Sequence, residues 1–354
     1  MVKKITWHTS YGEISVIERI FLNKGKLYRP FSYTAEVTSR CYSLPLQRII
    51  TDFGADVSFQ KISKKLMEHY GISVSISSAQ KVTEKHAESV KSMEHLQRDI
   101  PDEAGVKCLI CETDGTMIPI VDTDNKNGKS SDKRKTRSVR WKEARLALAR
   151  QKDKVDPVFG GTLGLADTAG DHLFDCAVKA GFGDRTKAHC VGDGASWIAE
   201  QVERVFCGQG NYLIDFYHLC DYLAAASKKC FPENPGSWLD QQKKRMKEGD
   251  VNEVLKSLSL HEEPESIEDK DAPVRCCIRY ISNRPGQFKY KEALADNLPI
   301  GSGEIESAHR YVIQNRLKLP GAWWKEKNAE HMLALRIIRE NDEWNKYWEC
   351  SKAA

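Results

Sequence analysis

The stretch Val106-Lys-Cys-Leu-Ile-Cys-Glu-Thr-Asp-Gly-Thr-Met-Ile-Pro-Ile-Val121 decides the fold class. Its two apolar runs flank a turn-like Asp-Gly pair, so it predicts strands at 106–113 and 116–121. Further strand-like runs follow at 141–150, 188–192 and 211–214. Helical patterns lie between and after them, at 170–180, 195–206 and 216–231. Because strands alternate with helices, we expect an α/β domain from residue 101 onward.

The first hundred residues have a different pattern. Residues 11–37 alternate in the manner of strands around Gly25, which predicts a small β element within 1–40. Residues 41–100 are predicted to be helical: apolar positions recur at helical spacing over 59–70, and Gly71 should end that helix. A second helix, capped by a serine at 77 or 78, should run to about residue 89. The layout fits a helix-turn-helix DNA reader or an ordinary helical hairpin.

The composition is that of an ordinary globular protein. The chain has 354 residues, of which 40% are hydrophobic and 29% charged. No apolar stretch is long enough to span a bilayer, and the first ten residues do not form a secretory signal.

Cys108 and Cys111 lie three apart on a predicted strand, so their side chains should point to opposite faces rather than share a zinc ion. We therefore expect a cytoplasmic protein with reduced cysteines and no membrane partner.

A basic segment lies between the second and third predicted strands. The net charge of the chain is only +4, but many cations crowd into this one region. They are Lys126, Lys129, Lys133, Arg134, Lys135, Arg137, Arg140, Lys142 and Arg145. Such clusters bind phosphate backbones, and they also occur in solvated loops.

Carboxylates follow the strands closely. Asp114, Asp193 and Asp215 each come directly after an apolar strand-like run, and Glu306 lies in the helix predicted after Gly301-Ser-Gly. Each aspartate could instead cap a helix or stabilise a turn. Glu304 lies two residues before Glu306, so at most one of them should face the sheet, and Glu306 is the one that shares a face with apolar residues.

Carboxylates from separate elements are what metal-dependent phosphodiester chemistry requires. Two Mg²⁺ ions can bind a scissile phosphate between them, one activating the attacking oxygen and the other stabilising the leaving oxygen. Because Mg²⁺ prefers oxygen ligands and keeps several waters, a few carboxylates suffice.

These motifs together resemble the DDE transposases of bacterial insertion sequences, especially the ISKra and ISLre-type groups. The matching stretches are Asp114-Gly-Thr, Trp141-Lys-Glu, Val191-Gly-Asp-Gly-Ala195, Asp215-Phe-Tyr-His218, Ile300-Gly-Ser-Gly-Glu-Ile-Glu-Ser-Ala-His309, Arg316-Leu-Lys318, Gly321-Ala-Trp-Trp324 and His331-Met-Leu-Ala-Leu-Arg336. The resemblance implies an RNase H-like mixed sheet with flanking helices, formed by 101–215 and 296–345, and a mostly helical insertion at 216–295. It also implies that Asp114, Asp193 and Glu306 hold two Mg²⁺ or Mn²⁺ ions.

The same resemblance implies an activity on DNA. Hydrolysis at a transposon end would free a 3′-OH, and that group would attack target DNA. His218 could contact the scissile phosphate or a displaced base. We predict DNA-backbone contacts from Lys133, Arg134, Lys135, Arg137, Arg310, Arg316 and Lys318. Trp323 and Trp324 could stack on a base, although core packing is the simpler expectation for both.

Two further expectations concern assembly and rival functions. Two transposon ends must meet, so a homo-oligomer is expected. A glycosidase would also use paired carboxylates, but it needs no basic cluster and no helix-turn-helix. A catalytically inactive, transposase-derived DNA-binding protein is the alternative that remains.

Overall fold

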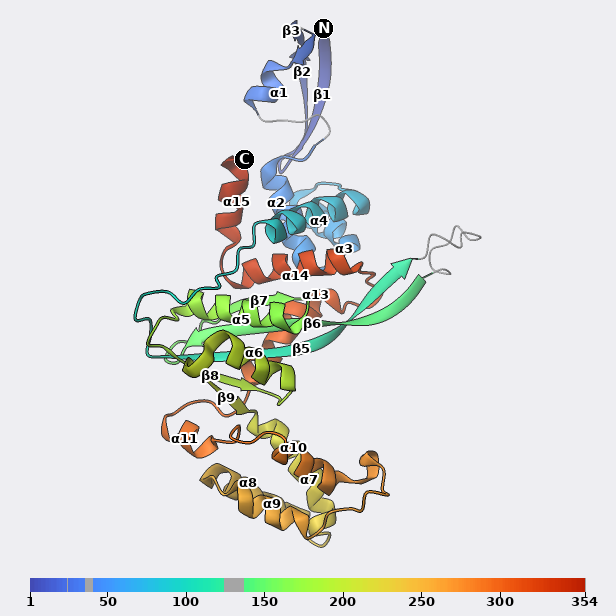
Figure 1. Cartoon of the computed structure of the whole chain (residues 1–354). Helices are drawn as coiled ribbons and strands as arrows, with labels where there is room; N and C mark the ends of the chain where they lie inside the picture. Colours follow the sequence, from blue (N-terminus) through green and yellow to red (C-terminus); the bar gives the residue numbers. More distant parts are fainter. Residues whose placement is uncertain (24, 36–40, 124–136, 354) are drawn as a thin grey trace. The chain divides into compact units, whose positions relative to one another are not determined.

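The computed structural model describes residues 1–23, 25–35, 41–123 and 137–353 (Figure 1). The chain divides into two compact units. Unit 1 contains Met1–Glu94, Ile118–Lys142 and Tyr311–Ala354, and unit 2 contains His95–Met117 and Glu143–Arg310. No helix within the described ranges is long and apolar enough to cross a membrane.

A five-stranded mixed sheet has the order β7-β6-β5-β8-β9. Its strands are β5 (Cys108–Thr123), β6 (Arg137–Gln151), β7 (Val158–Thr162), β8 (Lys187–Gly192) and β9 (Gly210–Ile214). β5, β8 and β9 pair in parallel, whereas β6 and β7 are antiparallel. An α/β fold was predicted, and the mixed sheet with its many helices confirms that class.

Two details of the sheet differ from the prediction. The predicted turn at Asp114 and Gly115 is wrong, because β5 continues through both residues. β7 was not predicted, since Gly160 and Gly161 weaken its strand pattern. The structure shows why a glycine stands at 160: a Cβ there would lie 2.9 Å from the Sγ atom of Cys176 on the helix α5 (Ala166–Ala180).

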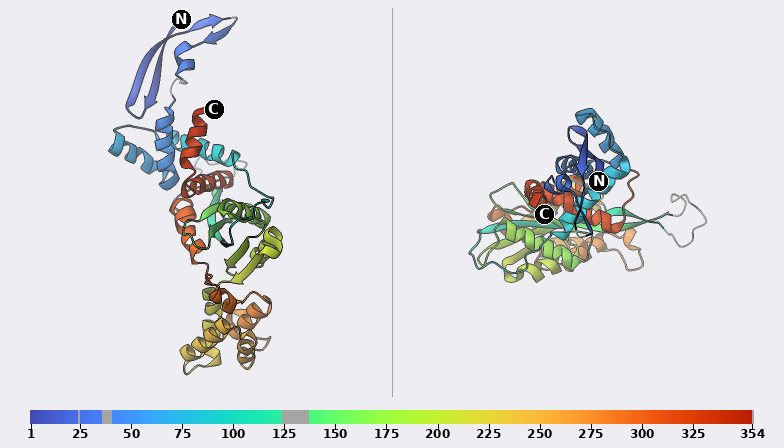
Figure 2. Two further views of the ribbon diagram at one scale, coloured as in Figure 1. Left: turned by 90° about the vertical axis from the view of Figure 1, so that its left-hand side faces the viewer. Right: turned by 90° about the horizontal axis from the view of Figure 1, so that it is seen from above.

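Helices α5 and α6 (Ser196–Phe206) cover one face of the sheet (Figure 2). Leu109 and Cys111 of β5 point to this face and belong to its buried core, with Leu173 of α5 and Phe206 of α6. Side chains alternate along a strand, so Ile110, Glu112 and Asp114 point to the opposite face. The sequence alternation therefore fixes the face on which Asp114 lies.

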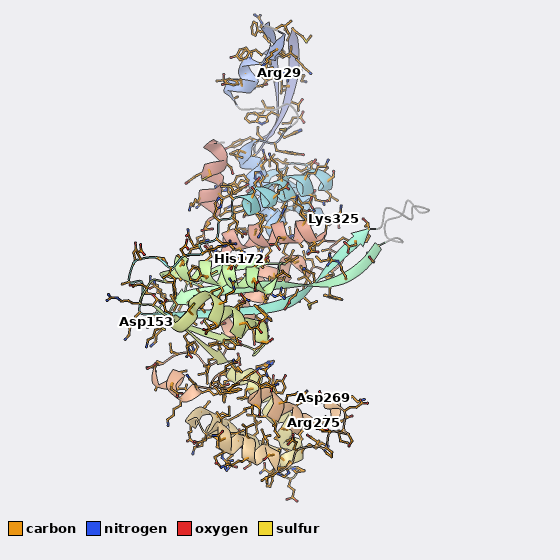
Figure 3. The ribbon with its side chains drawn as sticks, viewed as in Figure 1. Arg29, Asp153, His172, Asp269, Arg275 and Lys325 are labelled. Carbon is orange, nitrogen blue, oxygen red and sulfur yellow. The ribbon has the colours of Figure 1, made fainter. Side chains whose placement is uncertain are left out.

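Five helices follow β9, as predicted for 216–295: α7 (Phe216–Cys230), α8 (Pro235–Glu248), α9 (Val251–Ser259), α10 (Pro273–Ser282) and α11 (Tyr290–Ala295). They enclose an apolar cluster that includes Leu223, Met246 and Val254. The loop before α10 is held by Asp269, which accepts hydrogen bonds from Arg275 at 3.0 Å and Arg279 at 2.6 Å (Figure 3).

Unit 1 begins with the predicted β element. Antiparallel strands β1 (Val2–Thr9) and β2 (Gly12–Arg19) are followed by a short pair, β3 (Phe21–Asn23) and β4 (Lys26–Tyr28), and by α1 (Pro30–Thr34). The remaining helices of the unit are α2 (Leu44–Asp56), α3 (Phe59–Tyr70), α4 (Ile76–Ser92), α13 (Asn315–Leu317), α14 (Glu326–Glu340) and α15 (Trp344–Ala353).

The predicted pair of helices is present with one correction. Gly71 ends α3 in a left-handed conformation, as expected. Ser75 caps α4, in place of Ser77 or Ser78, and its hydroxyl accepts from the Ser78 amide at 3.1 Å. α4 packs against α2, α3 and α14 at once. Only a narrow stripe of α4, including Lys81 and Lys85, is exposed.

His86 of α4 should make the stability of the protein depend on pH. Its buried ring bonds to the Tyr347 hydroxyl at 2.7 Å and the Gln47 side chain at 3.0 Å, and burial followed by the nearby Lys85 lowers its pKa to about 4. The folded state therefore resists protonation of His86. The contribution of neutral His86 to the unfolding free energy is complete above about pH 6.5 and is lost as the pH falls toward 4. We expect this loss to be about 2–3 kcal/mol of unfolding free energy.

Urea denaturation at pH 7.5 and pH 4.5 measures the effect, with His86→Gln as the comparison. The glutamine variant cannot titrate, so it should lose less stability than the wild type between the two pH values. Parallel losses in both proteins would contradict the assignment.

Candidate catalytic site

Three aspartates form a row across neighbouring parallel strands. β5 and β8 pair from Cys108↔Lys187 to Glu112↔Val191, and this register, continued by two residues, brings Asp114 beside Asp193. β8 and β9 pair up to Gly192↔Ile214, so one further step brings Asp193 beside Asp215. The Asp215 amide donates to the Gly192 carbonyl at 2.7 Å, which extends the pairing to that level. Adjacent strands lie about 4.8 Å apart, so the backbones of the three aspartates follow one another across the sheet at about that spacing.

The loop that carries Asp193 is held from several sides. The carboxylate accepts from the Ala195 amide at 2.8 Å, and the Asp193 carbonyl accepts from the Tyr280 hydroxyl at 2.8 Å. The Gly194 carbonyl accepts from Arg284 Nε at 2.8 Å. Gly194 has a φ of 89°, and a Cβ there would lie 2.6 Å from the Tyr280 hydroxyl. The loop therefore requires glycine, and α10 with the residues just after it positions Asp193.

A short helix, α12 (Gly303–Ala308), lies against the same face of β5 as Asp114. Glu112 accepts from the Ile305 amide at 2.8 Å, and His309 Nε2 lies 3.3 Å from the Asp114 carboxylate. Residues 305 and 309 are one helical turn apart, so a single face of this segment contacts β5. Burial raises the pKa of Glu112 to about 8, although the Ile305 amide opposes that shift.

The two glutamates of α12 have different surroundings. Glu304 forms a two-pronged ion pair with Arg150 of β6, with Nε to Oε2 at 2.7 Å. Glu306 is exposed and lines a pocket of about 370 Å³ together with Asp215 and Tyr217. Within residues 1–23, 25–35, 41–123 and 137–353, no three His, Cys, Asp or Glu side chains are arranged to hold one metal ion. The structure thus brings α12 to the aspartate row, but it does not converge Asp114, Asp193 and Glu306.

Asp215 is the connection between the row and α12. Its Oδ1 atom accepts from the amides of Tyr217 at 2.6 Å and His218 at 2.9 Å, which caps α7. Its Oδ2 atom accepts from both the amide and the hydroxyl of Ser302 at 2.6 Å. A buried carboxylate with four donors fixes the residue before α12 as well as the start of α7.

His218 lies in an aromatic group beside the Asp193 loop. Its ring centre is 5.7 Å from that of Tyr222 and 6.0 Å from that of Tyr280, and these two tyrosines are stacked at 4.1 Å. Tyr280 is the residue whose hydroxyl holds the Asp193 carbonyl. His218 and the Asp193 loop therefore share Tyr280 as a neighbour.

The structure describes four of the seven predicted DNA contacts, and Lys133, Arg134 and Lys135 lie outside the described residues. Arg310 is exposed, Lys318 is half-buried, and the guanidinium of Arg137 lies 4.4 Å from the centre of the Trp323 ring.

Arg316 requires a correction. Only 2% of it is exposed, its Nε donates to the Gly54 carbonyl at 2.8 Å, and its guanidinium lies against the rings of Phe59 and Trp324. Burial lowers its pKa to about 10. This position does not fit a contact with DNA, so we assign Arg316 to packing. Trp324 is buried in the same cluster, as the packing interpretation of that residue predicted.

Sequence reasoning missed three residues of this site. Glu112 shares the Asp114 face of β5 by simple alternation, so its position could have been found from the strand pattern. The positions of Tyr280 and Arg284 could not have been found in this way, because these residues lie 87 and 90 positions along the chain from the loop residues that they hold.

Replacing Tyr280 by Phe tests the support of the Asp193 loop. The variant keeps the ring stack on Tyr222 but loses the bond to the Asp193 carbonyl, so we expect an unfolding free energy lower by about 1 kcal/mol. A small displacement of Asp193 should also slow any metal-dependent reaction at the site by about tenfold. Tyr222→Phe is the matched control and should leave the rate unchanged. Equal rates for Tyr280→Phe and wild type would show that the loop is held without this bond.

Comparison with known proteins gives limited matches. A family model described as "Uncharacterised protein family (UPF0236)" matches residues 182–351, which include Asp193, His218 and Glu306 but not Asp114. No curated protein matches the chain. Among solved structures, the Drosophila P element transposase strand transfer complex is similar at a TM-score of 0.31 and 11% identity, over 92% of this chain and 84% of that one.

Proposed function

We propose that the chain is a DDE-type DNA transposase with an RNase H-like core. The observation that carries this proposal is the row formed by Asp114 on β5 and by Asp193 and Asp215 just past the ends of β8 and β9, with the helix α12 against the same face of β5. A mixed sheet with helices on both faces is the architecture that the transposase resemblance implies.

Asp114, Asp193 and Glu306 would be the metal ligands. They supply oxygen donors from two strands and one helix, which suits Mg²⁺ or Mn²⁺. Asp114 is half-buried and has His309 beside it, while Asp193 has one oxygen committed to the Ala195 amide. Bound ions would act as Lewis acids on the phosphodiester.

Glu306 has to turn toward the aspartates for the set to be complete. It lies one residue after Ile305, whose amide is bonded to Glu112 on the strand that carries Asp114. Under the proposal, the change would take place in the Glu306 side chain and the short helix α12. His218 would contact DNA near Asp193.

The reaction would proceed in two phosphodiester exchanges. In the first, water attacks the phosphorus atom at a transposon end and a 3′-OH leaves. In the second, that 3′-OH attacks a target phosphodiester and displaces another 3′ oxygen. Arg310, Arg137, Lys318 and the basic residues 133–135 would bind the DNA backbone. Two ends must be held together, so we also propose a homo-oligomer.

The alternative is an inactive DNA-binding relative of such an enzyme. The observation that favours it is that no three ligand side chains among the described residues form a metal-binding group. Under this alternative DNA binding is retained and strand cleavage is absent at every metal concentration.

One experiment separates the two. Labelled DNA fragments that span the flanks of the protein's own gene are incubated with the full chain in Mg²⁺, in Mn²⁺ or in EDTA. We expect cleavage at a fixed position that yields 3′-OH ends with either ion and none with EDTA. Binding without cleavage in all three conditions supports the inactive alternative, and the absence of both binding and cleavage overturns the proposal.

A further inference from the structure

Tyr217 has an unusual position for an aromatic residue. It is 67% exposed, although the residues on either side of it, Phe216 and His218, take part in ring contacts. It lies in the first turn of α7, whose start is fixed by the buried Asp215 carboxylate. The backbone beneath the ring is therefore rigidly held while much of the side chain faces solvent.

The ring itself is held along one side. A Cβ on Gly301 would lie 2.8 Å from both Cδ2 and Cε2 of Tyr217, so only glycine lets the ring approach this closely. Phe216 packs against the ring edge-to-face, with ring centres 5.8 Å apart. An aromatic ring that is already oriented loses little conformational entropy on binding a ligand.

The same ring forms a wall of the pocket that Glu306 lines. Pro299, Ile300 and Gly303 complete the wall, so one side of the 370 Å³ space is apolar. Among the described residues, none that lines this pocket carries a positive charge, and two are carboxylates. A phosphate would be poorly accommodated against these walls, whereas a flat, uncharged group would fit.

We propose that Tyr217 stacks on an unpaired nucleobase of the DNA substrate, next to Glu306. The inference rests on the proposed function and names the part of the substrate that this pocket receives. Every base has a π-face, so stacking tolerates sequence variation and stabilises binding by about 1–3 kcal/mol per base. A base withdrawn from the duplex at this point would orient the neighbouring phosphodiester toward α12.

The test measures binding apart from cleavage. A single-stranded oligonucleotide of mixed sequence, with one 2-aminopurine moved along it, is titrated with the full chain in EDTA. At one or a few positions we expect the fluorescence to be quenched. Tyr217→Ala should weaken binding by about 5- to 150-fold and abolish the quenching, whereas Tyr217→Phe should keep both.

An abasic site provides the second arm. With an abasic nucleotide at the quenched position, the wild type should bind as weakly as Tyr217→Ala, and the variant should lose nothing further. Phe231→Ala, which removes a partly exposed aromatic at the other end of α7, is the matched control and should bind like the wild type.

The outcomes distinguish the two proposals. If the wild type binds and cleaves DNA but Tyr217→Ala binds and quenches equally well, the stacking inference is wrong and the transposase proposal stands. If stacking is seen without any metal-dependent cleavage, the inference stands and the catalytic proposal fails. If the wild type binds no DNA, both are overturned.

Discussion

Asp114→Asn and Asp193→Asn should each reduce metal-dependent strand cleavage by about 10³-fold or more. Asp114 lies on β5 and Asp193 directly follows the adjacent parallel strand β8, and under the proposal they supply the anionic oxygens that bind the ions. Asparagine keeps the shape of the side chain but removes its charge, so metal affinity and Lewis-acid stabilisation, together worth several kcal/mol, should be lost. Initial cleavage rates on labelled DNA over a range of Mn²⁺ concentrations measure the loss.

Stability and DNA binding should be retained in both variants. Asp193 accepts the Ala195 amide through one oxygen, and asparagine can accept the same bond. Asp153→Asn is the matched control, because Asp153 is an exposed carboxylate in the turn after β6 (Figure 3). Its rate should equal that of the wild type. Cleavage by Asp114→Asn or Asp193→Asn at the wild-type rate would show that the substituted aspartate is not required for the reaction.

Glu306→Gln tests the third proposed ligand separately. If the exposed Glu306 turns inward only when the site is loaded, this variant should bind DNA normally and lose cleavage to a degree similar to Asp114→Asn. Glu304→Gln would instead break an ion pair with Arg150, so it should lower stability by about 1 kcal/mol with a smaller effect on the rate. A larger loss of cleavage in Glu304→Gln would reverse the assignment of the two glutamates.

Local patterns were sufficient to predict much of the fold. β8, β9, α5, α6 and α7 lie close to where the sequence indicated them, the strands as short apolar runs and the helices by helical spacing. β5 was predicted as two strands, since Asp114 and Gly115 favour a turn when only neighbours in sequence are considered. In the sheet β5 lies between β6 and β8, and strand pairing overrides that preference.

Residues that depend on distant partners could not be predicted in this way. Arg316 follows a helical segment and precedes Leu317 and Lys318, so the sequence favours a surface cation. Phe59 and Trp324 enclose it instead, and the Gly54 carbonyl accepts its Nε proton. Nothing in the residues near 316 indicates that these partners converge on it.

The candidate site also combines features that follow from local sequence patterns with features that depend on distant contacts. Alternation and strand register place Asp114, Asp193 and Asp215 on one face. Alternation can be applied to the sequence once the strands are assigned, but the order and register of the strands come from the structure. The orientation of Glu306 depends on which residues of α12 contact β5. Ile305 and His309 make those contacts, through Glu112 and Asp114, and so Glu306 points aside.

Asp215 should be the most important residue for keeping this arrangement folded. Its buried carboxylate accepts from the amides of Tyr217, His218 and Ser302 and from the Ser302 hydroxyl. Asp215→Ala leaves these donors without an acceptor, so we expect the unfolding free energy to fall by about 3–5 kcal/mol. Asp215→Asn retains the cap of α7 but turns an amide group toward Ser302, and its loss should be about 2–3 kcal/mol.

Ser302→Ala completes the series, because it removes only one of the four hydrogen bonds and should cost about 1 kcal/mol. Urea denaturation of the three variants at pH 7.5 should therefore give the order Asp215→Ala, Asp215→Asn, Ser302→Ala from the largest loss to the smallest. Asp215→Asn should also cleave DNA more slowly than the wild type under conditions in which both proteins are fully folded. The reason is that Asp215 holds Ser302, which fixes the start of α12 and hence the position of Glu306. If Ser302→Ala destabilised the protein as much as Asp215→Asn while cleavage remained normal in both, Asp215 would be a helix cap alone, without a role in positioning α12.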